Sequence, residues 1–137
     1  VLGGPGREPG RFNGPTHITF RDGQLYVTDT LNARIQVLEP DGTVARTVGQ
    51  RGVYLGNFTR PKGVAVDSEG HIYAVESYYD HLLIYSNQGR FLMGIGGSGT
   101  SVGRFISPAG VWTDRRDRVF VADLMNGRVM VLQFLGN

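Results

Sequence analysis

A repeat of 46 or 47 residues runs along the whole chain and limits what it can fold into. The segments 10–20, 56–66 and 103–113 align with one another, and so do the segments 24–38, 71–85 and 118–132. The aligned positions include Phe12, Phe58 and Phe105, each followed three residues later by Pro15, Pro61 or Pro108. Three copies of a unit this long predict an array in which each unit buries its apolar face against a neighbour.

Each unit of the repeat is predicted to contain four short β-strands. The chain has 21 Gly and 6 Pro among 137 residues, and glycine at that level disfavours helices. Apolar segments of four to six residues lie between the turn residues; in the first unit they cover 17–20, 25–28, 34–38 and 43–48. Four-stranded units at this spacing are typical of the blades of an all-β propeller. We expect the repeated phenylalanines to wedge between neighbouring blades.

The repeat also resembles a known family. The pattern G-x-F-x-x-P-x-G-[IV]-x-V, followed by G-x-I-Y-V-x-[DE]-x-x-N-x-R-[IV]-x-V and a turn Gly, is similar to the NHL repeat over essentially all 137 residues. Because NHL domains usually have six blades, the resemblance implies three four-stranded blades and about half of a ring. The blade units cover about 10–49, 56–96 and 103–137.

The amino-acid sequence of the third unit is similar to the closing repeats of bacterial NHL proteins. Those proteins are exported and often accompany electron-transfer proteins. The resemblance therefore implies a periplasmic or extracellular location and, as one partner class, an electron-transfer protein. The chain has no Cys, which excludes disulfides and thiolate chemistry but is compatible with a cytoplasmic location as well.

The two ends of the chain are predicted to expose incomplete blades. Residues 1–4 match the end of an outer strand, because Val1–Leu2–Gly3 aligns with 47–49. The sequence stops at Gly136–Asn137, the turn that precedes the fourth strand of the third unit. We expect apolar faces at both ends, covered by remaining propeller blades from a second copy or from a longer parent chain.

Three acidic residues recur at the end of the second strand of each unit. They are Asp29, Glu76 and Asp123, and five residues after them stand Arg34, His81 and Arg128. Carboxylates arranged around an axis are possible Ca²⁺ ligands, but the fixed spacing to Arg favours an ion pair within each blade that pins the connecting loop. In the second unit, Glu76 and His81 predict a weaker and more pH-sensitive pair.

Catalytic signatures are absent from the sequence. There is no GxSxG, no phosphate-binding loop and no His cluster. His17 is predicted to face the central channel, because Gly63 and Gly110 occupy the equivalent positions. The six-bladed amidating lyases resemble this repeat and bind zinc through histidines directly after the repeated proline, where this chain has Thr16, Lys62 and Ala109. We therefore predict no metal, no cofactor and no enzymatic activity.

The loops on one face of the propeller hold the candidate binding residues. A formal net charge of +2 does not by itself indicate nucleic acid, and no segment is apolar enough for membrane insertion. The leading hypothesis is a scaffold that binds a protein partner, and binding of single-stranded RNA is the alternative. A metal-dependent lyase or hydrolase is a remote alternative. The plainest interpretation is that these are ordinary exposed loops without a binding role. The candidates are Asn32, Arg60, Lys62, Tyr78, Tyr79, His81, Arg104, Met125 and Asn126.

Overall fold

The computed structural model describes residues 1–136 and confirms an all-β chain. Asn137, part of the expected last turn, lies outside the described residues. The strands of the first unit are β1 (Pro15–Arg21), β2 (Gln24–Asp29), β3 (Arg34–Leu38) and β4 (Val44–Val48). Those of the second are β5 (Pro61–Val66), β6 (Ile72–Glu76), β7 (His81–Tyr85) and β8 (Phe91–Gly96). Those of the third are β9 (Pro108–Thr113), β10 (Arg118–Asp123) and β11 (Arg128–Gln133).

The strands form three separate antiparallel sheets, one for each unit of the repeat. The first two sheets have four strands each, in the orders β1-β2-β3-β4 and β5-β6-β7-β8, and the third has the order β11-β10-β9. Two 3₁₀ turns, η1 (Thr30–Asn32) and η2 (Leu124–Asn126), connect the second and third strands of the outer units. The predicted strands are present, and within residues 1–136 the third sheet has no outer strand, as expected.

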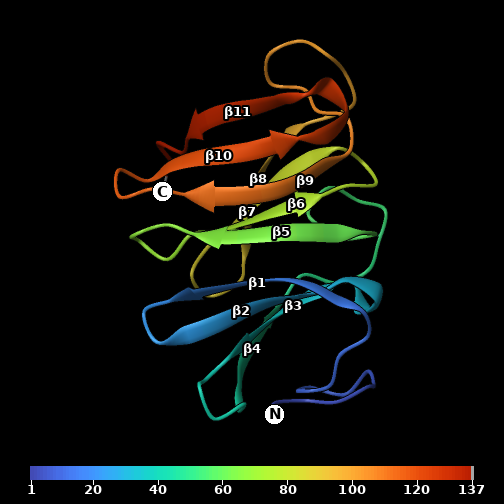
Figure 1. Ribbon diagram of the computed structural model, residues 1–137, viewed down its shortest axis with the longest axis vertical. Coiled ribbons are helices and arrows are strands. Elements are labelled where there is room, and N and C mark those ends of the chain that lie inside the picture. The colour runs from blue at the N-terminus through green and yellow to red at the C-terminus, as the bar shows by residue number, and fades with distance from the viewer. Residues whose placement is uncertain (137) are drawn as a thin grey trace.

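The sheets follow one another with their first strands side by side (Figure 1). The carbonyl oxygen of Val66, at the end of β5, accepts hydrogen bonds from both neighbouring sheets. Thr113 Oγ1 donates to it at 2.7 Å, and Arg21 Nη1 donates to it at 3.4 Å. These bonds join the first strands β1, β5 and β9 across the sheet boundaries.

The first of two apolar cores lies between the first and second sheets. One face of the first sheet contributes Tyr26, Ile35 and Val37, and the facing side of the second contributes Ile72 and Tyr85. Because β6 is covered on both sides, every residue of it is buried, which explains why it reads as a continuous apolar segment.

The second core has the same layout one repeat later. Tyr73, Leu82 and Ile84 of the second sheet pack with Val119 and Val121 of the third. The residues of each core therefore occupy equivalent positions of the repeat, and each sheet uses one face toward the preceding sheet and the other toward the following one.

The repeated phenylalanines seal the loop end of these cores. Phe58 and Phe105 are fully buried, one in each core, which confirms that they wedge between sheets. A connecting segment before each sheet forms a single parallel bridge to this residue, for example between Arg51 and Phe58. Gly49 has φ +80°, and a Cβ there would lie 2.2 Å from the Phe58 ring, so the chain needs glycine to pass it.

Apolar side chains cover the outer faces of the first and third sheets, as the sequence predicts. We call the outer face of the first sheet the N-terminal end face; it carries Phe12, Ile18, Phe20, Leu25, Val27 and Leu38. We call the outer face of the third sheet the C-terminal end face; it carries Trp112, Phe120, Ala122, Val129 and Val131. Ile18 and Phe20 are 62% and 61% exposed, and Trp112 and Val129 are 64% and 62% exposed.

We predict that Gly49→Ala destabilises the fold more than Gly23→Ala does. Both glycines have a positive φ, and forcing alanine into that region costs about 1–2 kcal/mol. Around Gly23 there is open space, whereas at Gly49 the new methyl group collides with Phe58, which adds about 1–3 kcal/mol of overpacking. Urea unfolding of the two variants measures the difference, and equal losses would contradict the close approach at Gly49.

Candidate functional site

The loop face is the edge of the three sheets where the chain enters each sheet and where the second strand turns into the third. It comprises residues 3–14, 49–60 and 96–107 together with 30–33, 77–80 and 124–127, and it lies on the right in Figure 1. Backbone hydrogen bonds join its loops within each unit, such as Ser77 N to Arg60 O at 3.1 Å and Met125 N to Ile106 O at 3.1 Å. Bonds between units, from Arg51 Nη2 to Leu31 O at 2.7 Å and from Ser107 N to Asp80 Oδ1 at 2.7 Å, connect the loops of neighbouring units.

Asp29 lies fully buried beneath the first unit's part of this surface and accepts four hydrogen bonds. Arg34 Nε donates to its Oδ2 at 2.8 Å and Asn32 Nδ2 does so at 2.9 Å. The backbone amide of Asn13 donates to Oδ1 at 2.7 Å, and Gln36 Nε2 adds a fourth bond at 3.2 Å. The expected ion pair with Arg34 is present, and the carboxylate also fixes the segment that leads into β1.

Asp123 plays the same part in the third unit. Arg128 Nε and Asn126 Nδ2 each donate to Oδ2 at 2.8 Å, and the backbone amide of Ile106 donates to Oδ1 at 2.8 Å. Burial alone raises the pKa of this carboxyl, but the bonds from Asn126, Ile106 and Arg128 outweigh it and lower the pKa below its ordinary value. The expected ion pair with Arg128 is therefore present in a site that favours the charged carboxylate.

The expected pair of Glu76 with His81 is wrong. Glu76 instead accepts hydrogen bonds from four backbone amides, those of Thr59, Arg60, Tyr78 and Tyr79. The bond from Thr59 is equivalent to the bond that Ile106 makes to Asp123, and the amides of Tyr78 and Tyr79 supply the donors to Oε2. His81 stacks against the Tyr79 ring with the centroids 6.5 Å apart.

The two asparagines proposed for partner binding serve the loops themselves. Asn32 Nδ2 donates to Gly6 O at 3.0 Å as well as to Asp29, and Asn126 Nδ2 donates to Gly99 O at 2.9 Å as well as to Asp123. Each amide therefore ties a connecting segment to its carboxylate. Their contact with a partner stays a prediction.

Tyr78, Tyr79 and His81 form a ring cluster on the loop face. The Tyr78 and Tyr79 rings meet edge to face with centroids 4.9 Å apart, and Tyr79 lies between Tyr78 and His81. Tyr78 is 61% exposed, whereas the other two are half-buried. Of the proposed binding residues, Arg60, Arg104 and Met125 are also exposed.

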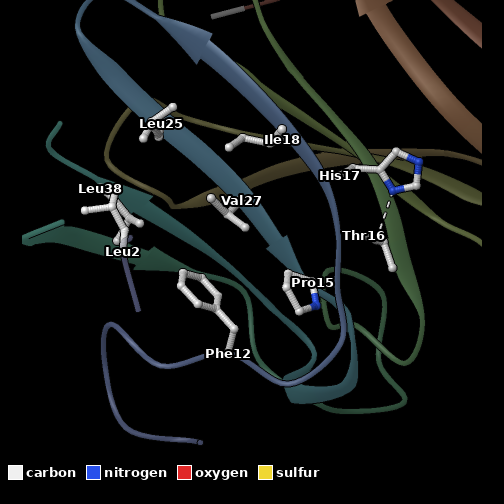
Figure 2. Close-up of a pocket in the computed structure, with 9 residues that line it drawn as sticks. All are labelled: Leu2, Phe12, Pro15, Thr16, His17, Ile18, Leu25, Val27 and Leu38. Atoms are coloured by element: carbon white, nitrogen blue, oxygen red, sulfur yellow. Dashed lines mark hydrogen bonds between the residues drawn. The ribbon is translucent and has the colours of Figure 1, made fainter. Parts of the chain in front are cut away.

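Lys62 is a half-buried residue of β5 that acts on His17 rather than belonging to the ring cluster. The His17 ring points from β1 toward β5, and its Nδ1 lies 2.9 Å from Thr16 Oγ1 (Figure 2). Burial lowers the pKa of His17, and the charge of Lys62 lowers it further. Channel-facing exposure of His17 stays a prediction.

Further exposed apolar residues on the loop face escaped the sequence analysis. The tip of the second connecting segment exposes Val53 (73%), Tyr54 (80%) and Leu55 (55%), and the third exposes Val102 (87%). The sequence signal for this exposed tip was the apolar triplet 53–55 within a glycine-rich connecting segment. The 3₁₀ turns add exposed Leu31 and Leu124.

A basic hollow of about 710 Å³ lies at the opposite edge of the sheets and also escaped the sequence analysis. It is lined mainly by Arg21, Trp112, Arg115, Arg116 and Arg118. Within it, Arg118 Nη2 lies 2.7 Å from an Asp114 carboxylate oxygen. Its sequence signal was the arginine-rich turn 114–118, which we had interpreted only as a connection between two strands.

No three His, Asp or Glu side chains among residues 1–136 are grouped so that they could hold a metal ion. The two helices in that part of the chain have three residues each, and neither can cross a membrane.

Similar folds occur in solved structures of low sequence identity. A Bacteroides fragilis protein described as exported has a TM-score of 0.68 at 17% identity, and the match covers 92% of this chain and 36% of that one. Virginiamycin B lyase from Staphylococcus aureus has a TM-score of 0.61 at 14% identity, with 89% and 42% covered. A streptogramin B lyase has a TM-score of 0.63 at 16% identity, with 90% and 41% covered.

The chain thus spans about two fifths of the length of these proteins. No family model matches the chain, and none of the curated proteins does. At such identities the likeness concerns the fold, and together with the three successive antiparallel sheets it shows a β-propeller type of fold.

We predict that Asp123→Asn lowers the free energy of unfolding by about 1–3 kcal/mol at neutral pH, because a charged acceptor is lost from three hydrogen bonds. The folded-state pKa of Asp123 lies below its ordinary value of 3.8, so the unfolded chain binds the proton more readily. The stabilisation is present above that value and is lost as the pH falls through the folded-state pKa.

Urea unfolding at pH 7 and near pH 3 measures this dependence, and the gap between the variant and the parent should shrink in acid. Asp22→Asn is the matched control, because the Asp22 side chain is 81% exposed and its replacement should change little. A gap that stays constant with pH would show that Asp123 does not act through its charge.

Proposed function

We propose that the chain is part of an NHL-type β-propeller that binds a protein partner through the loop face and catalyses no reaction. The observation that carries this proposal is the concentration of large exposed apolar side chains on that face. They are Leu31, Val53, Tyr54, Leu55, Tyr78, Val102, Leu124 and Met125. Large exposed apolar side chains that gather on one face are typical of interaction sites.

The rigidity of the loops supports binding. Asp29, Glu76 and Asp123 each fix their loop through several hydrogen bonds to buried carboxylate oxygens. Arg34 and Arg128 extend this bracing, since their Nη atoms donate to backbone carbonyls of the connecting segments. Loops held in place before binding lose less conformational entropy when a partner docks.

The chemistry of the face indicates what the partner presents. Tyr and Arg are enriched in binding hot spots, and here exposed Tyr78 lies in the same loop system as Arg60, whose carbonyl oxygen accepts from Ser77. We infer a partner with apolar side chains flanked by acidic ones. An electron-transfer protein outside the cytoplasm is one such partner class, and the similarity to an exported protein is in line with that location.

RNA binding is the second candidate, favoured by the ring cluster of Tyr78, Tyr79 and His81. The arginine cluster around Arg116, however, lies at the opposite edge of the sheets. The rings and this basic hollow therefore make no continuous track for a nucleic acid backbone. A lyase activity is the remote candidate, since the similarity to the lyases, at 14–16% identity, concerns the fold alone.

We predict that Tyr78→Ala weakens binding of the partner by about 1–2 kcal/mol, or roughly tenfold. The chain, immobilised, first captures its partner from an extract treated with nuclease, and the affinity of the isolated partner is then measured. Tyr78 is the better target than Tyr79, whose ring is packed between two others. The melting temperature should not change.

Met93→Ala is the matched control, because Met93 is 41% exposed on the outer strand β8, away from the loop face. A parallel titration with fluorescent oligouridine tests the RNA alternative, and tight binding with a steep salt dependence would replace the protein-binding proposal. Unchanged affinity with a lowered melting temperature would make Tyr78 a structural residue.

A further inference from the structure

A hollow of about 270 Å³ on the loop face is lined by three arginines from three different segments. Arg7 belongs to the connecting segment before β1, Arg34 is the first residue of β3, and Arg51 belongs to the connecting segment before β5. Leu31 and Asn32 of η1 complete the lining of this arginine hollow. The arginine hollow therefore lies where the first unit meets the start of the second.

The guanidinium group of Arg34 is held in place but keeps one nitrogen without an acceptor. Its Nε donates to Asp29 Oδ2 at 2.8 Å, and its Nη2 donates to Glu8 O at 3.1 Å and to Arg11 O at 2.9 Å. Its Nη1 donates to no atom of residues 1–136 and is not buried. Because the Arg34 side chain is only 13% exposed, this nitrogen offers its two N–H groups from a fixed position in the lining.

The equivalent arginine of the third unit has no such free nitrogen. Arg128 Nη1 donates to Thr100 O at 2.8 Å, and its Nε and Nη2 also have acceptors. In the first unit Arg7 aligns with Thr100, and its carbonyl oxygen accepts no hydrogen bond from Arg34. The first unit therefore has an available donor and an additional cation where the third unit has a closed contact.

Two of the three positive charges around the arginine hollow have no carboxylate partner. Asp29 compensates Arg34, whereas neither Arg7 nor Arg51 forms an ion pair with a carboxylate of residues 1–136. Arg51 Nη2 donates to Leu31 O at 2.7 Å, which positions the guanidinium group, and its Nε and Nη1 have no acceptor among the same residues. Two positive charges are therefore left to be balanced by a ligand.

We propose that the arginine hollow binds a phosphate group as a dianion. A phosphate group with two negative charges balances both uncompensated arginines, whereas a single carboxylate balances only one. Its three terminal oxygens can each accept from a different guanidinium group, and Arg is the side chain best suited to hold phosphate oxygens. The ligand is a small anion, so this inference does not depend on the protein partner of the proposed function.

Leu31 indicates what the phosphate group is attached to. Its side chain is 54% exposed and forms part of the lining. The arginine hollow has roughly nine times the volume that one water molecule occupies in the liquid, which leaves room beside a phosphate group. We therefore expect a phosphate monoester whose substituent contacts Leu31. Free inorganic phosphate has the same chemistry and would use the arginines alone.

NMR titration near pH 8, which follows the Nε–H signals of the arginines, tests the site with inorganic phosphate and phenyl phosphate as probes. Saturable binding should shift the signals of Arg34 and Arg51. Arg51→Gln should weaken the binding of both probes by about tenfold or more, the loss expected for a hydrogen bond between charged groups. The melting temperature of this variant should not change, because the Arg51 side chain is exposed.

Arg115→Gln is the matched control, because Arg115 is an exposed arginine of the basic hollow at the opposite edge of the sheets. It removes the same charge and should leave both affinities unchanged. Weaker binding in Arg115→Gln but not in Arg51→Gln would place the phosphate in the basic hollow and overturn the proposal. So would the absence of saturable binding, or equally tight binding of acetate or dimethyl phosphate, which carry a single charge.

Leu31→Ala distinguishes the two sources of the phosphate group. If the ligand is a monoester, this variant should bind phenyl phosphate more weakly and inorganic phosphate as before. Equal affinities of the two probes in the parent chain would contradict the monoester and leave inorganic phosphate as the ligand. Tyr78→Ala, which tests the loop face for a protein partner, should leave phosphate binding unchanged, so the two proposals can fail separately.

Discussion

The packing of one sheet face onto the next is the interaction on which the rest of this structure depends. A single sheet cannot bury its own faces, so each sheet relies on its neighbours for burial of apolar area. Ile72 and Val75 show the consequence most clearly, because they point to opposite faces of β6 and belong to different cores, yet both are fully buried. The second sheet thus has both faces covered, whereas the first and third sheets each have one exposed face.

The same packing positions the surface that we propose as functional. The second strand of each sheet ends at the loop face with a buried carboxylate. This carboxylate accepts hydrogen bonds from the connecting segment, from the 3₁₀ turn or loop, and from an Arg where one is present. Asp80 adds a bond between units, because it accepts from the backbone amide of Ser107 at 2.7 Å. Stacking of the sheets and bracing of the loops therefore form one continuous framework, and this framework carries the exposed Tyr78 and Met125.

Most of the fold could be predicted from the sequence, because the repeat shows three times which residue types occupy each structural position. The ion pair of Asp29 with Arg34 and the burial of Phe58 follow from that recurrence. Glu76 shows where the approach fails. Its equivalents pair with an Arg five residues later, but Glu76 accepts hydrogen bonds from backbone amides, including those of Tyr78 and Tyr79. Backbone donors leave no mark in a repeat pattern. The exposed tip at Val53 was missed because connecting segments vary where no packing constrains them.

Native-state hydrogen exchange, resolved by segment, tests the central claim that sheet-on-sheet packing controls the stability of this chain. The account predicts that amides of β6 and β7 exchange most slowly at every protein concentration, since both of their faces are covered within one copy. Amides of β1 and β11, whose sheets each have an open end face, should exchange faster in dilute solution. Slower exchange in β1 or β11 than in β6 under those conditions would contradict the account.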